Sequence, residues 1–478
     1  MRNEEFRAVN ERQEAVVFHS SFNIPCVSFA FILRPSFFIL ALSMALSAGG
    51  CGGEWSSSRS TASYTASATL PALPAAAPLE AGDKANETAI RFLEQRVKSD
   101  PDDFSAHNKL AGYYHLRLRE TGDLNYLDLA ARAARASLAS VPEARNAGGL
   151  ATLTQSEFAA HDFAAARDHA MQLALLAPGK SYPYGMLGDA LLELGEYEKA
   201  ADAYRQMERR AGGISESTET RQARLAQLRG DSAGARRHFT RALVLALDLP
   251  LPPRETVAWC RWQLGETAFS TGDYETAERH YRDALTTFPD YYRVLASLGR
   301  VRIARGDLAD AIEQYEHATR RLPDPEFVAA LGDLYKLAGR EKESAAQYAL
   351  VEKIGHLSAA NGALYNRQLA LFYADHDMKA EEAYANAVKE YEVRRDIHGA
   401  DALAWTALKA GRINEAQTFI KAALRLGTRD AKLFYHAGMI ARAAGDQTSA
   451  RDYLKRALAL NPRFDPLQSI IAVKALEK

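Results

Sequence analysis

Between residues 258 and 324 the same landmarks return at a fixed spacing of 34 residues. The matched positions are Leu264-Gly265 with Leu298-Gly299, Gly272 with Gly306, Ala277 with Ala311, Tyr281 with Tyr315, Ala284 with Ala318, and Pro289 with Pro323. Landmarks that keep one period indicate a structural repeat, and a repeat of this length predicts a solenoid of stacked helical units. A stack of this kind favours a long binding surface over an enclosed catalytic pocket.

Each landmark has a physical role within a unit of two helices. A small residue after a large one allows close approach of a neighbouring helix, and Gly272 supplies backbone angles that a tight turn requires. The stripe of Ala277, Tyr281 and Ala284 lies on one helical face, and Pro289 ends the second helix. This pattern resembles the tetratricopeptide repeat, with its large-small pair, turn glycine, Ala–aromatic–Ala stripe and terminal proline.

Weaker copies of the pattern extend in both directions from the strongest pair, from about residue 104 to residue 464. The resemblance implies an all-α, right-handed superhelical solenoid of about ten helix pairs. We expect a repeat array over residues 85–464 and a capping helix over 465–478, since an array must close its exposed end.

The region before the array has a different composition. Residues 36–48 are apolar, follow Arg34 and lead into Gly49-Gly50-Cys51, which resembles the signal peptide and lipidated cysteine of bacterial lipoproteins. The segment before the apolar core departs from that pattern because it is long and carries four glutamates, and Ala48 departs from it because leucine is usual three residues before the cysteine. We expect a signal peptide over 1–50, lipidation at Cys51 and a disordered Ser/Thr/Ala/Pro tether over 51–84. An unlipidated signal, an uncleaved anchor and a cytoplasmic protein stay open as alternatives.

The net charge and the lack of catalytic motifs argue against nucleic-acid binding and against enzymatic activity. Lys and Arg number 59 against 60 Asp and Glu, so a balanced charge gives no general attraction to nucleic acid, and we expect none among the partners. Phosphate-binding loops and nucleophile motifs are missing, so we expect no catalytic residues, no metal and no cofactor. Asp375-His376-Asp377 is interpreted as a polar helix–helix turn, and Cys260 as a small core residue.

The resemblance places ligand-facing positions on the first helix of each unit. The candidate partner-binding residues are Trp262, Glu266, Arg293, Arg300, Asp333, Lys336, Arg367, Trp405, Tyr435 and Arg442. Trp, Tyr and Arg are the residues that interface centres favour. Solvation, or packing between repeats, explains the same residues equally well. The clamp for acidic chaperone tails needs Lys and Asn where Trp262 and Glu266 stand, so that subtype does not fit.

These features predict a scaffold attached to the bacterial cell envelope, on the periplasmic or outer-membrane side, that binds a protein or peptide through its groove. One alternative is a non-catalytic subunit of an enzyme complex, or an atypical hydrolase that uses Asp375, His376 and Asp377. A cytoplasmic adaptor is the other alternative.

Overall fold

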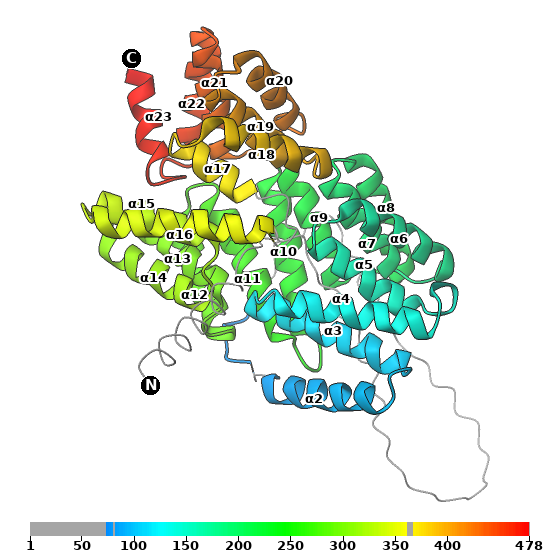
Figure 1. Cartoon of the computed structure of the whole chain (residues 1–478). Helices are drawn as coiled ribbons and strands as arrows, with labels where there is room; N and C mark the ends of the chain where they lie inside the picture. Colours follow the sequence, from blue (N-terminus) through cyan, green and yellow to red (C-terminus); the bar gives the residue numbers. More distant parts are fainter. Residues whose placement is uncertain (1–72, 80–81, 361–366, 478) are drawn as a thin grey trace, which may run out of the picture.

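The computed structural model describes residues 73–79, 82–360 and 367–477 of the chain. In these ranges the chain forms 22 α-helices and one short 3-10 turn, η1 (Glu143–Arg145), and no β-strand (Figure 1). The signal peptide expected over 1–50 and the candidate lipidation site Cys51 lie outside the described residues.

Ten helix pairs make up the body of this part of the chain, and Figure 1 shows them stacked one after another. The first helices are α3 (Phe104–Thr121), α5 (Ala147–Ala159), α7 (Tyr182–Glu193), α9 (Glu216–Leu228), α11 (Arg254–Phe269), α13 (Tyr292–Ala304), α15 (Pro325–Leu337), α17 (Arg367–Asp375), α19 (Ile397–Lys409) and α21 (Ala431–Ala443). The second helices are α4 (Asn125–Ser140), α6 (Phe163–Leu176), α8 (Tyr197–Ala211), α10 (Ser232–Leu247), α12 (Tyr274–Thr287), α14 (Leu308–Arg321), α16 (Glu341–Ala360), α18 (Ala380–Val393), α20 (Ile413–Ala423) and α22 (Gln447–Leu460). The all-α solenoid of about ten pairs that the repeat predicted is confirmed.

Two more helices flank the pairs. Helix α2 (Asp83–Ser99) precedes the first pair and begins inside the expected tether 51–84, and α23 (Gln468–Glu477) follows the last pair. Buried apolar clusters each draw on neighbouring pairs, as in the cluster that contains Tyr281, Leu298 and Tyr315. Stability therefore comes from a series of local cores, as is typical of repeat arrays.

The glycine and the tyrosine of the repeat fit together within each strong unit. A Cβ on Gly265 would overlap the ring of Tyr281, whose side chain is 0% exposed. The same relation joins Gly299 to the ring of Tyr315. The first helix therefore needs glycine at this position because the tyrosine of the second helix occupies the space of a side chain.

The turn inside each pair also follows from the sequence. Gly272 adopts a left-handed φ of 77°, which glycine reaches without steric cost. The next residue, Asp273, accepts a hydrogen bond from the backbone nitrogen of Thr276 at 3.1 Å, so it caps α12. Gly306 and Asp307 repeat this arrangement before α14.

The array curls back on itself, so that turns within pairs contact linkers between pairs about 200 residues further along. The backbone nitrogen of Ile397 donates to the Tyr197 hydroxyl at 2.8 Å, 200 residues away. The hydroxyl of Thr428 donates to the carbonyl oxygen of Leu228, again at a separation of 200. Figure 1 accordingly shows α17 and α18 next to the region of α8–α10. We call these interactions the return contacts.

A third return contact lies at the end of the last pair. The side-chain amide of Asn461 donates to the carbonyl oxygen of Phe269 at 2.8 Å, and its amide oxygen accepts from the Tyr274 hydroxyl at 2.5 Å. The turns before α8, α10 and α12 thus meet the linkers before α19, α21 and α23 in order. Among the described residues no helix is long and apolar enough to cross a membrane.

Candidate partner-binding site

The candidate site is the row of first helices from α11 to α21, which carries all ten residues expected to face a partner. Three of the ten, Arg367, Trp405 and Tyr435, are buried. Lys336 is exposed, and the remaining six side chains are partly exposed. Partner binding by these ten residues stays a prediction, and most of them make contacts within the chain.

Glu266 is held by three donors from its own pair and the next. The hydroxyl of Tyr281 donates to its carboxylate at 2.7 Å, the hydroxyl of Ser297 donates at 2.8 Å, and Arg300 forms an ion pair with it. Burial raises the pKa of Glu266, but the charge and hydrogen bond of Arg300 outweigh burial, so the net pKa lies below the usual value. Two of the ten residues therefore join adjacent repeats to each other.

Asp333 has an equivalent place two first helices further along the row. The hydroxyl of Tyr348 donates to it at 2.6 Å, and Nε2 of His376 lies 2.7 Å from the same carboxylate. Nδ1 of His376 lies 2.7 Å from the carbonyl oxygen of Phe372. Both partners of the imidazole are acceptors, so both ring nitrogens must donate and the ring carries a positive charge.

The pKa of His376 agrees with this geometry. Burial lowers the pKa, but the hydrogen bond to Asp333 and the negative charge of that carboxylate raise it by more, so the net pKa lies above the usual value.

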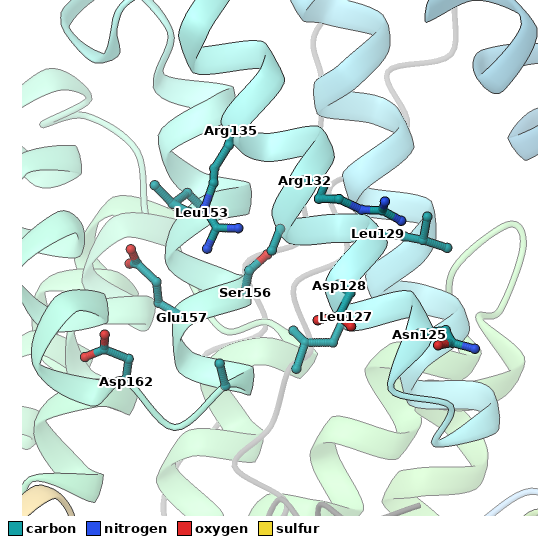
Figure 2. A pocket seen from close by; sticks show the side chains of 12 residues that line it. Asn125, Leu127, Asp128, Leu129, Arg132, Arg135, Leu153, Ser156, Glu157 and Asp162 are labelled. Atoms are coloured by element: carbon teal, nitrogen blue, oxygen red, sulfur yellow. The ribbon is translucent and has the colours of Figure 1, made fainter. Parts of the chain in front are cut away.

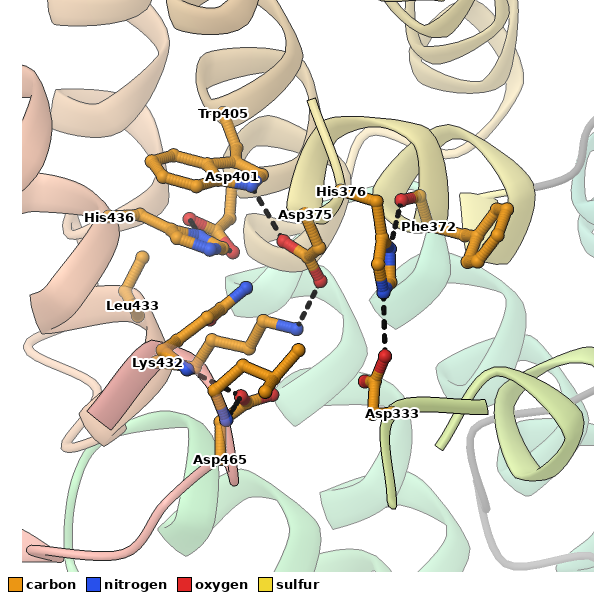
Figure 3. A network of polar contacts seen from close by, with 12 residues as sticks. Asp333, Phe372, Asp375, His376, Asp401, Trp405, Lys432, Leu433, His436 and Asp465 are labelled. Atoms are coloured by element: carbon orange, nitrogen blue, oxygen red, sulfur yellow. Dashed lines mark hydrogen bonds and ion pairs between the residues drawn. The ribbon is translucent and has the colours of Figure 1, made fainter. Parts of the chain in front are cut away.

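A further set of contacts centres on Asp375 (Figure 3). Its carboxylate accepts from Nε1 of Trp405 at 2.7 Å and from Nζ of Lys432 at 2.9 Å. Burial raises the pKa of Asp375, but the charge of Lys432 together with the hydrogen bonds from Lys432 and Trp405 outweighs burial, so the pKa lies below the usual value. The Lys432 side chain is 36% exposed, so this ion pair is in contact with solvent.

Asp465, in the linker after the last pair, lies beside Lys432 in Figure 3. It accepts from the backbone nitrogens of Leu467 and Gln468 at 2.9 and 2.8 Å, at the start of α23. Burial raises the pKa of Asp465, and Lys432 opposes that rise. We call Asp333, His376, Asp375, Lys432 and Asp465 the inner network.

Trp405 and Tyr435 form a buried aromatic cluster beside the inner network. The Trp405 ring stacks on the His436 ring with centroids 4.2 Å apart, and Tyr435 packs against Trp405 at 5.6 Å. Nδ1 of His436 is 2.9 Å from Asp401, which fixes the imidazole against the indole. Both aromatic residues are packed between repeats, which is one of the two alternatives left open by the sequence.

Arg367 belongs to a buried ionic cluster at a return contact instead of an open groove. Its guanidinium lies 3.3 Å from both Glu390 and Asp396. Arg394 bridges Asp396 at 2.9 Å and Glu193, 201 residues away, at 2.6 Å. The physical reason for its burial is pairing, since a buried charge needs an opposite charge and hydrogen bonds.

The four remaining residues make lighter contacts. Nε1 of Trp262 donates to Ser297 at 2.9 Å, and the Arg293 guanidinium lies 5.6 Å from the Trp262 ring. Arg442 donates to the carbonyl oxygen of Ala475 in α23 at 2.9 Å. Lys336 extends from α15 into solvent.

The three consecutive residues Asp375, His376 and Asp377 diverge to different partners. Asp375 bonds Trp405 and Lys432, and His376 bonds Asp333, whereas Asp377 accepts from Lys409 at 2.6 Å. In the described part of the chain no group of three potential ligands is placed to hold a metal ion. The arrangement gives no support to a hydrolase built on these three residues.

Cys260 is fully buried, and burial raises its pKa, so it is held as a neutral thiol.

A cavity of about 760 Å³ lies among the first pairs, away from the candidate row in sequence (Figure 2). Asp128, Arg132 and Arg135 of α4 line it together with Glu157 of α5 and Asp162. The carboxylate of Glu157 lies 2.7 Å from Nδ1 of His169 and is paired with it. The cavity lining thus carries charges of both signs, and it does not point to one class of ligand.

Sequence reasoning missed Ser297, Lys432 and Asp465. Ser297 and Lys432 lie on first helices at places other than those chosen from the repeat resemblance, and Asp465 lies in a linker that carries no repeat landmark. A detectable signal existed for the carboxylates, because Glu266 and Asp333 each stand 15 residues before the stripe tyrosine that binds them.

Four segments of the sequence match known protein families. Models described as tetratricopeptide repeat match residues 182–208, 215–290, 268–334 and 402–463. No curated protein matches the sequence significantly.

Several solved structures resemble the fold at low identity. The human IFIT1 dimer with PPP-AAAA is 13% identical, with 80% of this chain and 96% of that chain covered and a TM-score of 0.42. PilW, a type IV pilus biogenesis factor, is 17% identical over 47% of this chain and 97% of its own, with a TM-score of 0.37. A tetratricopeptide repeat protein from Parabacteroides merdae is 16% identical over 55% and 97%, with a TM-score of 0.30.

One expectation is corrected by these structures. The balanced net charge led us to exclude nucleic acid as a partner, but the similar IFIT1 structure holds the oligonucleotide PPP-AAAA. The exclusion is wrong, because whole-chain charge averages over surfaces and does not describe any one groove of a long array. What the matched segments and the described helices establish together is the class of protein: the chain is an α solenoid that contains tetratricopeptide repeats.

Proposed function

We propose that the chain is a protein-binding scaffold that contacts an extended segment of a partner polypeptide along the first helices α15, α17, α19 and α21. The inner network supports this proposal, because residues from α15, α17, α21 and the final linker gather in one place. The Asp333–His376 and Asp375–Lys432 pairs and the backbone hydrogen bonds to Asp465 fix the positions of the charges, and fixed charges give a partner specificity and register.

The neighbouring surface supplies exposed polar contacts on a rigid aromatic support. Trp405 and Tyr435 are buried between repeats and pack against each other, which makes the support rigid, and Lys336 and Asp377 are exposed. Asp377 is 78% exposed in its side chain, so a cation of the partner can reach it without breaking a buried bond. Charged groups on a rigid, preorganised support are what a specific binding site requires.

Site-specific photo-crosslinking in the native host tests this proposal. A benzophenone amino acid replaces exposed Lys336 on a first helix, and the matched control replaces exposed Lys455 on the second helix α22. We expect an adduct from position 336, absent at position 455, that protease digests. An adduct removed by nuclease, or equal adducts from both positions, would contradict the proposal.

We also propose that this scaffold is held at the bacterial envelope through lipidated Cys51. The apolar run 36–48 before the cysteine and the Ser/Thr/Ala/Pro segment after it support this proposal. Labelling with a palmitate analogue should mark the natural chain and not Cys51→Ser, which should accumulate as a larger precursor. An intact N-terminus at Met1 in the natural chain would refute it.

A further inference from the structure

The segment 73–79, Leu-Pro-Ala-Ala-Ala-Pro-Leu, lies against the array although it falls inside the expected disordered tether 51–84. Leu73 and Leu79 both pack on an apolar cluster built from α9, α10 and α11. Nη2 of Arg261 donates to the carbonyl oxygen of Pro74 at 3.5 Å, 187 residues away in sequence. The segment is therefore seated on a defined surface.

Burial along this segment has a period of three. Leu73, Ala76 and Leu79 are partly buried, and the four residues between them are exposed. A polyproline II helix has three residues per turn, and Pro74 and Pro78 hold their φ at the value that it needs. Its carbonyl groups make no internal hydrogen bonds, so they are free to accept from a neighbouring side chain.

The surface beneath the segment has the features that such a peptide requires. Trp259 packs edge-on against Phe239 with centroids 5.8 Å apart, and both belong to the cluster that Leu73 and Leu79 contact. Aromatic-lined surfaces are the usual receptors of polyproline II peptides.

Arg261 provides the polar part of this surface. Its side chain is 2% exposed and pairs with Asp283 at 3.2 Å. Within the described residues, its buried Nε has no hydrogen-bond partner. A buried donor without a partner is costly, so this guanidinium has capacity for another acceptor beside the carbonyl oxygen of Pro74.

We propose that the surface formed by α9, α10 and α11 is a binding site for extended Pro/Ala-rich peptides with large apolar residues six positions apart, and that residues 73–79 are its built-in occupant. A partner peptide with the same spacing displaces this segment. The segment is connected to α2 at Asp83 by a few residues, so its effective concentration is high and an external peptide must compete with it. This site does not involve the inner network, so either proposal can fail while the other stands.

The test uses the full chain and a fluorescent peptide with the sequence of residues 73–79. Leu73→Asp/Leu79→Asp should release the built-in segment, because charged side chains disfavour an apolar surface. Fluorescence anisotropy should then show saturable peptide binding about tenfold tighter than to the natural chain, in which the site is occupied.

A matched control separates loss of the apolar contacts from added charge. Ala75→Asp/Ala77→Asp places the same two charges at exposed positions of the segment, and it should bind the peptide as weakly as the natural chain does. Equal binding to all three chains, or no saturable binding to Leu73→Asp/Leu79→Asp at up to about 1 mM peptide, would overturn the proposal.

Hydrogen exchange gives a second, independent measurement on the same chains. Amides of α11 (Arg254–Phe269) should exchange faster in Leu73→Asp/Leu79→Asp than in the control. Identical exchange in α11 would mean that the segment does not occupy this surface.

Discussion

The hydroxyl of Tyr281 donates a 2.7 Å hydrogen bond to Glu266, which stands 15 residues earlier on the first helix of the same pair. The same separation recurs twice, and in all three sets a cationic side chain of a later helix pair binds the same carboxylate. The three sets are Glu266 with Tyr281 and Arg300, Asp189 with Tyr204 and Arg221, and Asp333 with Tyr348 and His376. The stripe tyrosine thus fills the space beside a glycine and also anchors a polar link between repeats.

The first prediction concerns this hydroxyl. Tyr281→Phe keeps the ring against Gly265 but removes a hydrogen bond to a charged group, so it should lower the free energy of unfolding by about 1.5–3 kcal/mol. Tyr315→Phe is the matched control, because no hydrogen bond of its hydroxyl is found among the described residues, and it should cost less than about 0.5 kcal/mol. Urea unfolding of the two variants compares these costs, and equal losses would contradict the role assigned to Glu266.

Glycine at position 265 gives the second prediction. Gly265→Ala would gain helix propensity, yet its Cβ would overlap the Tyr281 ring, so we expect a net loss of about 1–3 kcal/mol. Gly179→Ala, where a Cβ meets no atom within 4 Å, should be close to neutral. Thermal unfolding of both variants is the measurement. A stabilised Gly265→Ala chain would mean that the two helices of this unit are further apart.

The third prediction is a pH dependence at His376. Its folded-state pKa is raised above the ordinary 6.5, so the Asp333–His376 contact contributes stability that is complete below the unfolded pKa and is lost as pH rises through the folded pKa. Local stability at α17, followed by hydrogen exchange, should therefore fall as the pH rises above the ordinary 6.5 and through the raised folded-state pKa.

His376→Gln is the control for this effect, because glutamine does not titrate. That variant should lose the pH-dependent part and keep whatever pH dependence the rest of the chain has. If NMR titration placed the His376 pKa below 6.5, the imidazolium assignment would be wrong.

The fourth prediction tests the return contacts. Arg394→Ala leaves Glu193 buried without its ion pair, which should cost about 3–5 kcal/mol. Because that contact joins residues 201 apart, small-angle scattering should also show a larger radius of gyration. The double variant Glu193→Gln/Arg394→Met removes both charges and should cost less than Arg394→Ala alone. A larger cost for the double variant would show that the contact does not depend on charge pairing.

Most of the fold was predictable because the residues that recur in the sequence are those that pack against each other within one helix pair. Gly265, Gly272 and Tyr281 are each required by contacts or backbone angles within one helix pair. Their spacing in the sequence therefore predicts the structure of that pair. The return contacts were not predictable, since Tyr197 and Ile397 meet only after the curvature of many pairs has accumulated. Curvature depends on small rotations at every interface, which no single landmark encodes.

The candidate site was predictable in part for the same reason. The resemblance placed Glu266 and Asp333 on first helices, where they lie in the structure, but it could not show that each is bound by a tyrosine and a cation. Arg367 illustrates the limit most clearly, because its partners Glu390 and Asp396 become neighbours through the folding of the next pair and a return contact. Pairing between distant segments decides whether a charged first-helix residue faces a partner.

The return contacts also restrict how this chain can change in length. Most repeat arrays tolerate duplication or deletion of one unit, because each unit touches only its neighbours. Here the loss of one 34-residue unit between Leu228 and Arg394 would bring the linker before α21, instead of the linker before α19, opposite the turn at Gly195, so Glu193 would no longer meet Arg394. All the later contacts would slip together, so the number of units in this interval is fixed by geometry, and insertions are tolerated where they leave that count unchanged.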